Sequence, residues 1–374
     1  MEEQVKNIVV GEQEEYVINM GPQHPSTHGV LRLVVSLQGE IVTNIEPHIG
    51  YIHRGIEKMC ESLTYTQIIH LTDRMDYLSA HINNEAVCLN VEKALEIDIP
   101  ERVKVIRTIM AELTRIQSHQ LFWATFGMDL GGLTCFFYGL RDREKIMDIF
   151  EETCGGRLLV SYNCPGGLMY DIHPNFQKRV KEFIKYFRKT LPEYDQLLTG
   201  NVIFKERTQN IGKLPLEDAI SYGVTGPSGR ASGFSCDVRK ADPYSAYDRV
   251  KFNEVLFAQG DTYHRYLVRI EEMRESMNII DQLIDNIPEG QYAIKMKPVI
   301  RLPEGEYYQR VETARGELGV YIISDGNKNP FRVKFRSPNF VNLSALNLMT
   351  KGFKIADLVA ISGSLDLIIP DIDR

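Results

Sequence analysis

Residues 100–113 read Pro100-Glu-Arg-Val103-Lys-Val-Ile106-Arg-Thr-Ile-Met110-Ala-Glu-Leu113. Apolar residues recur in this stretch at intervals of three and four, which is typical of a helix that turns one face to a core. Pro100 suits the first turn of such a helix, where its missing N–H is not needed. The stretch therefore predicts a core helix, and similar stretches downstream predict a helix-dominated fold.

Further helical patterns follow, and β-branched or alternating runs flank the helical part of the chain. Helices are expected over Leu133–Thr153, Pro174–Leu198, Asp261–Ile287 and about Ala345–Ala360. The alternating runs predict strands with hairpin turns between them. These runs are Tyr16–Met20, Gly29–Leu37, Ile41–His48, Tyr308–Arg315, Glu317–Ser324 and Phe331–Phe335.

The order of these elements predicts an α+β fold rather than an alternating α/β fold. Residues 1–15 are expected to form a polar N-terminal extension, and one domain is expected over residues 16–374. The parts of this domain are a β-rich start (16–50), a helical core (56–290), a β insertion (305–337) and a C-terminal helical segment (338–374).

Composition excludes several classes of protein. The chain has 374 residues, a net charge of -7 and 43% hydrophobic residues, which is ordinary for a soluble globular protein and argues against a general nucleic-acid binder. The chain has no run of about 18 apolar residues, which is the length that a membrane-spanning helix needs, so no membrane span is predicted. The polar N-terminus lacks the pattern of a signal peptide. We therefore expect a cytoplasmic location, with membrane contact only through partners.

The six cysteines are widely spaced, and the nearest two, Cys154 and Cys164, are ten residues apart. Zinc and iron–sulfur sites draw on clustered thiolates. We therefore expect free thiols and no metal bound by this chain. The dinucleotide and phosphate-loop motifs are also missing, so no flavin or nucleotide site is expected. The glycine-rich run 223–233 fits no phosphate motif and predicts a tight structural loop.

An unusual loop sequence, Gly21-Pro-Gln-His24-Pro-Ser-Thr-His28-Gly29, places two histidines four residues apart. Prolines and glycines exclude a helix there. The two imidazoles either hydrogen-bond within a structured loop or face a ligand.

Three further stretches invite simple explanations when each is taken alone. Arg54 and Glu57 fit an i, i+3 pair on a helix. Tyr77 fits a core tyrosine, and Asp129 fits the cap of the following helix. The stretches themselves are His53-Arg-Gly-Ile-Glu-Lys58, Thr64-Tyr-Thr-Gln67 through Asp73-Arg-Met-Asp-Tyr77, and Met128-Asp-Leu-Gly-Gly132.

Taken together and in this order, the motifs resemble the D-type subunit of the NADH:quinone oxidoreductases over nearly the whole chain. That family is similar in fold to the large subunit of nickel–iron hydrogenases, which implies a hydrogenase-large-subunit-like fold here. Those hydrogenases hold nickel with two C-x-x-C pairs. The corresponding positions in this chain are Asp76, Ser79, Ile368 and Asp371. This set cannot replace soft thiolate ligands, so the resemblance implies a cavity without the metal and argues against a hydrogenase.

The resemblance implies that the cavity accepts a quinone head group, with His28 and Tyr77 as its ligands and Asp129 as the partner of His28. His24, Thr125 and Met128 are further candidates for the quinone pocket. A quinone gains two electrons and two protons, and Tyr77 and His28 offer an O–H and an N–H to its oxygens. Asp129 would orient His28 and stabilise its protonated form.

The electron donor must lie in a different protein of the complex, since this chain lacks cluster ligands. The resemblance implies three partners: a small subunit with the terminal four-iron cluster, a C-type subunit, and a membrane subunit that forms the quinone channel. Arg54 and Arg74 are candidates to lie near that cluster, although either could instead pair with Glu57 or Asp73. The chain is then peripheral at the cytoplasmic face of the membrane. Whether NADH, ferredoxin or a deazaflavin supplies the electrons stays open, and a scaffold with a decayed pocket is the remaining alternative.

One stretch departs from the family. Relatives commonly show G-x-R-M-H-x-x-Y-x-R-P-G-G, whereas Leu159 stands here at the histidine position and Cys164 at the second arginine. A nearby histidine couples cluster reduction to protonation, and leucine cannot titrate. The departure predicts a low-potential cluster with weak pH dependence, suited to a quinone such as menaquinone. The alternative is that a partner's side chain takes over the coupling.

Overall fold

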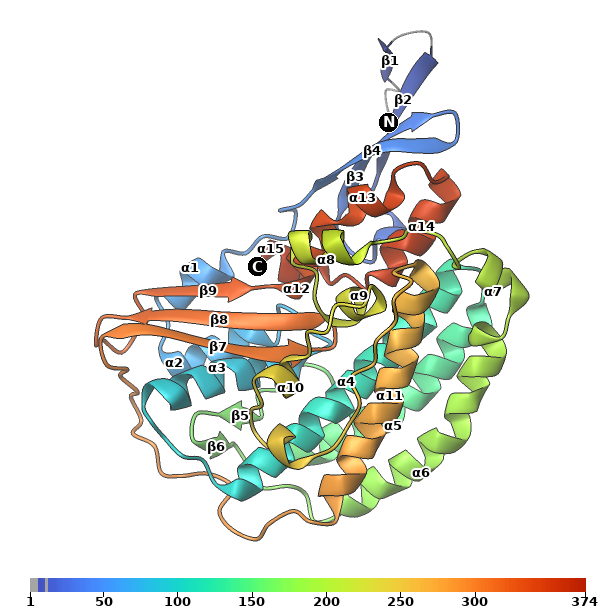
Figure 1. The fold of residues 1–374 in the computed structure, drawn as a ribbon. Helices are drawn as coiled ribbons and strands as arrows, with labels where there is room; N and C mark the ends of the chain where they lie inside the picture. The colour runs from blue at the N-terminus through green and yellow to red at the C-terminus, as the bar shows by residue number, and fades with distance from the viewer. Residues whose placement is uncertain (1–5, 11–12) are drawn as a thin grey trace.

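The structure, a computed structural model, describes residues 6–10 and 13–374. The predicted extension over residues 1–15 lies partly outside these residues. In its described part, β1 (Lys6–Val10) pairs antiparallel with β2 (Gln13–Met20). These strands project from the body of the molecule, as Figure 1 shows at the top.

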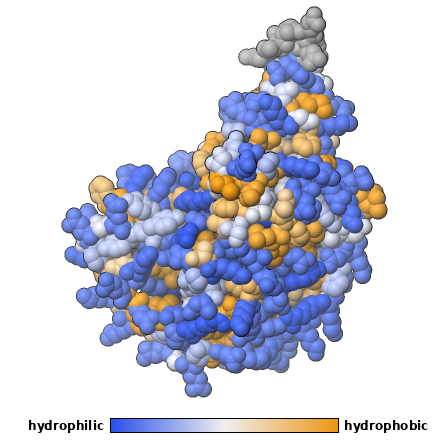
Figure 2. Space-filling model, viewed as in Figure 1, coloured by the Kyte–Doolittle hydropathy of each residue, from blue (hydrophilic) through white to orange (hydrophobic). Residues whose placement is uncertain are grey.

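The N-terminal sheet has the strand order β1-β2-β3-β4. As predicted, β3 (Arg32–Gln38) and β4 (Ile41–His48) form a hairpin, and Gly39 in its turn has a φ of 61°. Alternate residues of β3 are buried, so one face of the sheet packs on a core. That core includes the C-terminal helices α13 (Leu346–Thr350) and α14 (Ile355–Ser364). Apolar side chains gather where the sheet meets the body of the molecule (Figure 2).

Long helices form the body of the molecule, in agreement with the apolar stripes of the sequence. The helix α4 (Glu101–Asp129) begins directly after Pro100 and is buried over most of its length. Both α5 (Leu133–Cys154) and α11 (Thr262–Ile284) pack against it, and α6 (Phe176–Tyr194) packs on α5 (Figure 1). Among the described residues, no helix combines the length and apolar character needed to cross a bilayer.

A second antiparallel sheet confirms the small sheet predicted near the C-terminus. It consists of β7 (Gly305–Thr313), β8 (Gly316–Ser324) and β9 (Arg332–Arg336) in that order. The sheet packs against α3 (Ala80–Ala94). The remaining elements are short: α1 (Ile56–Cys60), α2 (Tyr65–Thr72), β5 (Asn163–Cys164), β6 (Gly167–Leu168), α7 (Val202–Glu206), α8 (Leu216–Tyr222), α9 (Gly226–Ala231), α10 (Val238–Ala241), α12 (Pro338–Ser344) and α15 (Ile369–Asp373).

Two predicted elements differ in the structure. The glycine-rich run 223–233 is not only a loop, because its middle forms the short helix α9. The single helix expected near Ala345–Ala360 is divided into α13 and α14, and Gly352 between them has a φ of 86°, which interrupts a right-handed helix.

The last helix, α15, closes the fold against the N-terminal part of the chain. The carboxylate of Asp373 accepts hydrogen bonds from the backbone N–H groups of Gly50 (2.8 Å) and Ile52 (2.9 Å). Segments from the two halves of the sequence thus meet beside the body of long helices, and the fold is α+β, as predicted.

Candidate functional site

A cavity of about 250 Å³ opens where the loop after β2 meets the C-terminal half of α4 and the segment between α14 and α15. Four of the predicted site residues line it, namely His28, Tyr77, Thr125 and Met128. The other lining residues are Pro25, Leu78, Leu121, Phe122, Asp366, Leu367 and Ile368. The walls are therefore mostly apolar with a few convergent polar groups, which is typical of a ligand site.

His28 meets Asp129 at one side of this cavity. Nε2 of His28 lies 2.5 Å from Oδ2 of Asp129. Burial of the imidazole disfavours its charged form, but the hydrogen bond and the charge of Asp129 outweigh burial and raise the pKa of His28. Asp129 is the last residue of α4, and α5 begins after Gly132, so Asp129 does not cap the following helix as its sequence position first suggests.

The loop that carries His28 is fastened by its own polar groups. His28 adopts a left-handed backbone conformation with a φ of 54°. The hydroxyl of Thr27 donates to the carbonyl oxygens of His24 (2.7 Å) and Gly29 (2.9 Å). His24 is exposed, and its Nδ1 accepts a hydrogen bond from the backbone N–H of Ser26 (3.2 Å). The structure thus gives His24 a place in the loop and not in the lining of the cavity.

Tyr77 and Thr125 contribute the hydroxyl groups of the cavity lining. Burial raises the pKa of Tyr77, so its phenol keeps its proton at neutral pH and can donate a hydrogen bond. The hydroxyl of Thr125 already donates to the carbonyl oxygen of Leu121 (3.0 Å), which leaves it as an acceptor for a ligand. Met128 is 38% exposed and lies at the rim.

Arg54 and Arg74 lie together on the surface, away from the lining. Nη2 of Arg54 donates to the backbone carbonyl oxygen of Arg74 at 3.1 Å. The prediction that Arg54 and Glu57 form an i, i+3 pair on a helix is wrong. Arg54 lies before the helix, because α1 begins only at Ile56, after Gly55 with a φ of 64°. Glu57 instead accepts from Lys334 (2.8 Å) and Arg374 (3.0 Å).

Sequence reasoning missed two functional candidates, Asp366 and Arg315. Asp366 lines the cavity, and the guanidinium of Arg315 lies directly behind it, with Nη2 3.0 Å from Oδ2 of Asp366. A charged residue in a hairpin turn is usually a surface residue, so nothing in the local sequence marks Arg315. Asp366 could have been found only through its place in the C-terminal stretch.

The four positions compared with hydrogenase thiolates are buried, with Ile368 in the lining of the cavity and Asp76, Ser79 and Asp371 outside the lining. Nη1 of Arg315 lies 3.3 Å from Oδ2 of Asp76 and 3.5 Å from Oγ of Ser79. Asp371 accepts from Nδ2 of Asn339 at 2.7 Å, and burial raises the pKa of Asp371. Within the described part of the chain, no three histidine, cysteine or carboxylate side chains are arranged to hold a metal ion. A guanidinium cation thus lies among these positions.

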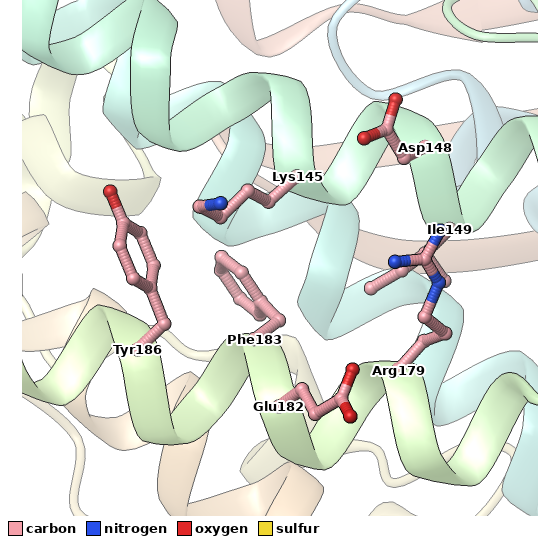
Figure 3. Close-up of a pocket in the computed structure, with 7 residues that line it drawn as sticks. All are labelled: Lys145, Asp148, Ile149, Arg179, Glu182, Phe183 and Tyr186. Carbon is pink, nitrogen blue, oxygen red and sulfur yellow. The ribbon is translucent and has the colours of Figure 1, made fainter.

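A second hollow lies between α5 and α6, and Figure 3 shows the side chains around it. It is about 150 Å³ in volume and contains none of the predicted site residues. Its cations already have partners, because Nζ of Lys145 lies 4.4 Å from the ring centre of Tyr186 and Arg179 pairs with Glu152. This groove therefore offers less to a ligand than the cavity beside His28.

Residues 129–300 and 293–374 match the family described as the 49 kDa subunit of respiratory-chain NADH dehydrogenase. The chain belongs to this family. Curated relatives agree with the match. A protein of Bacteroides thetaiotaomicron, named as the C/D subunit of an NADH-quinone oxidoreductase, is 59% identical over 97% of this chain and 68% of its own length.

Two relatives that are named as the D subunit of NADH-quinone oxidoreductase match over almost their entire length. The protein of Desulforamulus reducens is 48% identical over 96% of this chain and 98% of its own. The protein of Clostridium beijerinckii is 46% identical over the same share of each chain, 96% and 98%. The resemblance to the D-type subunit is thereby confirmed, and as a member of the 49 kDa family the chain is a subunit of an oxidoreductase complex.

Proposed function

We propose that this member of the 49 kDa family binds the quinone head group of an NADH:quinone oxidoreductase and supports its reduction to quinol. One observation carries the proposal: two hydrogen-bond donors from distant segments, His28 and Tyr77, line a single mostly apolar cavity. A flat ring with two carbonyl oxygens matches such a cavity, because the ring packs on apolar walls and each oxygen needs a donor.

The chemistry follows from the groups that line the cavity. A quinone becomes a quinol by taking up two electrons and two protons, one proton on each oxygen. The electrons are supplied by an iron–sulfur cluster in a partner subunit. Tyr77 donates a hydrogen bond to the charge that develops on one oxygen, and His28 donates to the other. Asp129 stabilises the protonated imidazole and raises the pKa of His28, so the ring keeps a proton to higher pH than it would without this carboxylate.

The family and the names of its relatives support the proposed partners. The electron donor is the small subunit with the terminal four-iron cluster, beside which Arg54 and Arg74 are proposed to lie. A C-type subunit is a further partner, since relatives are named as a combined C/D subunit. A membrane subunit forms the rest of the quinone channel, which places this chain at the cytoplasmic face of the membrane. The relatives' names favour NADH over ferredoxin or a deazaflavin as the upstream donor.

Tyr77→Phe tests the proposal in the assembled complex. The change removes one O–H donor and keeps the ring, and loss of one such donor lowers a rate by about 10²–10³-fold. Quinone reduction by NADH should fall accordingly, whereas electron transfer to ferricyanide, which bypasses the cavity, should persist. Tyr186→Phe is the matched control, because it also removes a tyrosine hydroxyl, here one that donates to Asp142 at 2.6 Å, but lies in the α5–α6 groove. Equal loss in both assays, or no loss with quinone, would contradict the assignment.

A further inference from the structure

A buried arginine lies at the turn between β7 and β8, where a surface residue would be expected. The side chain of Arg315 is 0% exposed. The turn can enter the core because Gly226 lacks a side chain, and a Cβ there would lie 2.4 Å from the carbonyl oxygen of Arg315. Nδ2 of Asn342 donates to the same oxygen at 3.2 Å. The backbone of Arg315 is thus held from outside, while its guanidinium points inward.

The guanidinium connects three segments that form the cavity. Its Nε donates to the backbone carbonyl oxygen of Asp366 at 3.0 Å, and Nη2 lies 3.0 Å from the carboxylate of the same residue. Its Nη1 donates to Oγ of Ser118 on α4 at 2.7 Å and lies 3.3 Å from Asp76. Asp76 precedes Tyr77 in the sequence. A planar group with five N–H donors in a fixed fork suits such a junction, which a lysine could not reproduce.

The charges around Asp366 show what the guanidinium does for the cavity. Asp76 and Asp366 are only 2% and 6% exposed, and buried carboxylates require paired cations. Four groups face Asp366 from different elements: Arg315 from the hairpin turn, Arg269 from α11 with Nε at 3.8 Å, His28 from the N-terminal loop, and Tyr77. Of the two arginines, Arg315 makes the shorter contact with Asp366, at 3.0 Å compared with 3.8 Å for Arg269. Its charge also opposes the rise that burial causes in the pKa of Tyr77.

We propose that Arg315 is a positioning residue of the quinone cavity, which fixes Asp366 in the cavity wall and holds the segment of Tyr77 against α4. This inference rests on the proposed function. Arg315 is not among the lining residues, so it acts through Asp366 and Asp76 and not by contact with the quinone. The charge of Asp366 then favours the protonated form of His28 beside the substrate.

The test uses the assembled complex with Arg315→Met or Arg315→Lys, assayed with quinone and with ferricyanide from about pH 6 to 8.5. Arg315→Met should lower quinone reduction at neutral pH by roughly 10²-fold, the loss that a displacement of about 1 Å in an active site produces. The loss should grow as pH rises, because Asp366, when it is no longer held in place, raises the pKa of His28 less. Arg315→Lys keeps the charge and should show a smaller loss without new pH dependence. Ferricyanide reduction should persist in both variants.

A matched control and a double variant separate positioning from general damage. Arg107→Met also removes a buried arginine, paired with Glu92 at 2.8 Å, but away from the cavity, so it should affect both acceptors equally and at all pH values. Adding Asp366→Asn to Arg315→Met should not change the pH dependence further, because Arg315 acts on His28 through Asp366. If Arg315→Met fails to assemble, Arg315→Lys decides, since an unchanged rate or an equal loss with both acceptors overturns the inference.

Tyr77→Phe in the same series distinguishes the two proposals. A specific loss of quinone reduction in Tyr77→Phe, with a pH profile of Arg315→Met parallel to that of the parent complex, would overturn the role of Arg315 and leave the proposed function standing. Full quinone reduction in both Tyr77→Phe and Arg315→Met would overturn both proposals.

Discussion

Replacement of Asp129 by asparagine removes the charge beside His28 and keeps the shape of the side chain. Nε2 of His28 and Oδ2 of Asp129 lie 2.5 Å apart, and only 6% of the Asp129 side chain is exposed, so solvent screens the pair little. A hydrogen bond to a charged group contributes about 1.5–3 kcal/mol. If this energy is lost at the reacting oxygen, quinone reduction at neutral pH should fall by about 10- to 100-fold in Asp129→Asn, since about 1.4 kcal/mol corresponds to a factor of ten.

The sign of the pH effect follows from the pKa of His28. Burial opposes the imidazolium, and Asp129 outweighs burial through its hydrogen bond and charge. Without the carboxylate, burial prevails, and His28 loses its proton at a lower pH than in the parent protein. The defect of Asp129→Asn should therefore be largest at about pH 8 and should shrink toward about pH 6, where the proton returns.

Quinone reduction by the assembled complex across this pH range measures the effect, with ferricyanide reduction as the check on assembly. Asp261→Asn is a close control, because Asp261 pairs with Nδ1 of His264 at 2.6 Å with similar burial but lies outside the cavity lining. Asparagine also keeps the capping of α11, which Asp261 provides through the backbone N–H of His264. A defect of Asp129→Asn that is constant over the pH range would refute the reasoning.

Three further outcomes are expected. The double variant His28→Ala with Asp129→Asn should be about as slow as the slower single variant, because residues that act as a unit are not additive; multiplication of the two defects in steady-state assays would show independent roles. Elemental analysis of the purified chain should find no stoichiometric nickel, iron or zinc, and about one metal per chain would contradict this. A redox titration of the partner's terminal cluster by electron paramagnetic resonance should show a slope well below the ~59 mV per pH unit of one-proton coupling, because Leu159 cannot titrate; a slope near that value would refute the prediction.

The long helices and the two larger sheets could be predicted because their signals are local. The stripe of α4 and the alternation of β3 each depend on residues a few positions apart. The exceptions have local physical reasons. Gly55 delays the start of α1, so Arg54 and Glu57 do not lie on the same helix. Gly226 and Arg315 lie close together although they belong to segments far apart in the sequence, so no local pattern could predict their contact.

The site was less accessible to sequence analysis, because its contacts join distant residues. His28 and Asp129 are 101 positions apart, and only the family resemblance related them. Arg315 and Asp76 are 239 positions apart, and a charged residue in a hairpin turn gives no sign that it is buried. The polar groups behind the cavity therefore required the three-dimensional structure.

The bonds of Asp373 to Gly50 and Ile52 affect the order in which the protein can mature on the ribosome. The partners of the first of these bonds are separated by 323 positions, so the loop at residues 50–52 lacks these contacts until residue 373 has been translated. Until then, residues 366–368 do not cover the apolar cavity wall at Leu121. The carboxylate of Asp76 likewise lacks its cation until Arg315 has been translated. Exposed apolar surface of this kind promotes chaperone binding and aggregation. Nascent chains should consequently gain protease resistance around residues 50–52 only after residues 366–373 have emerged.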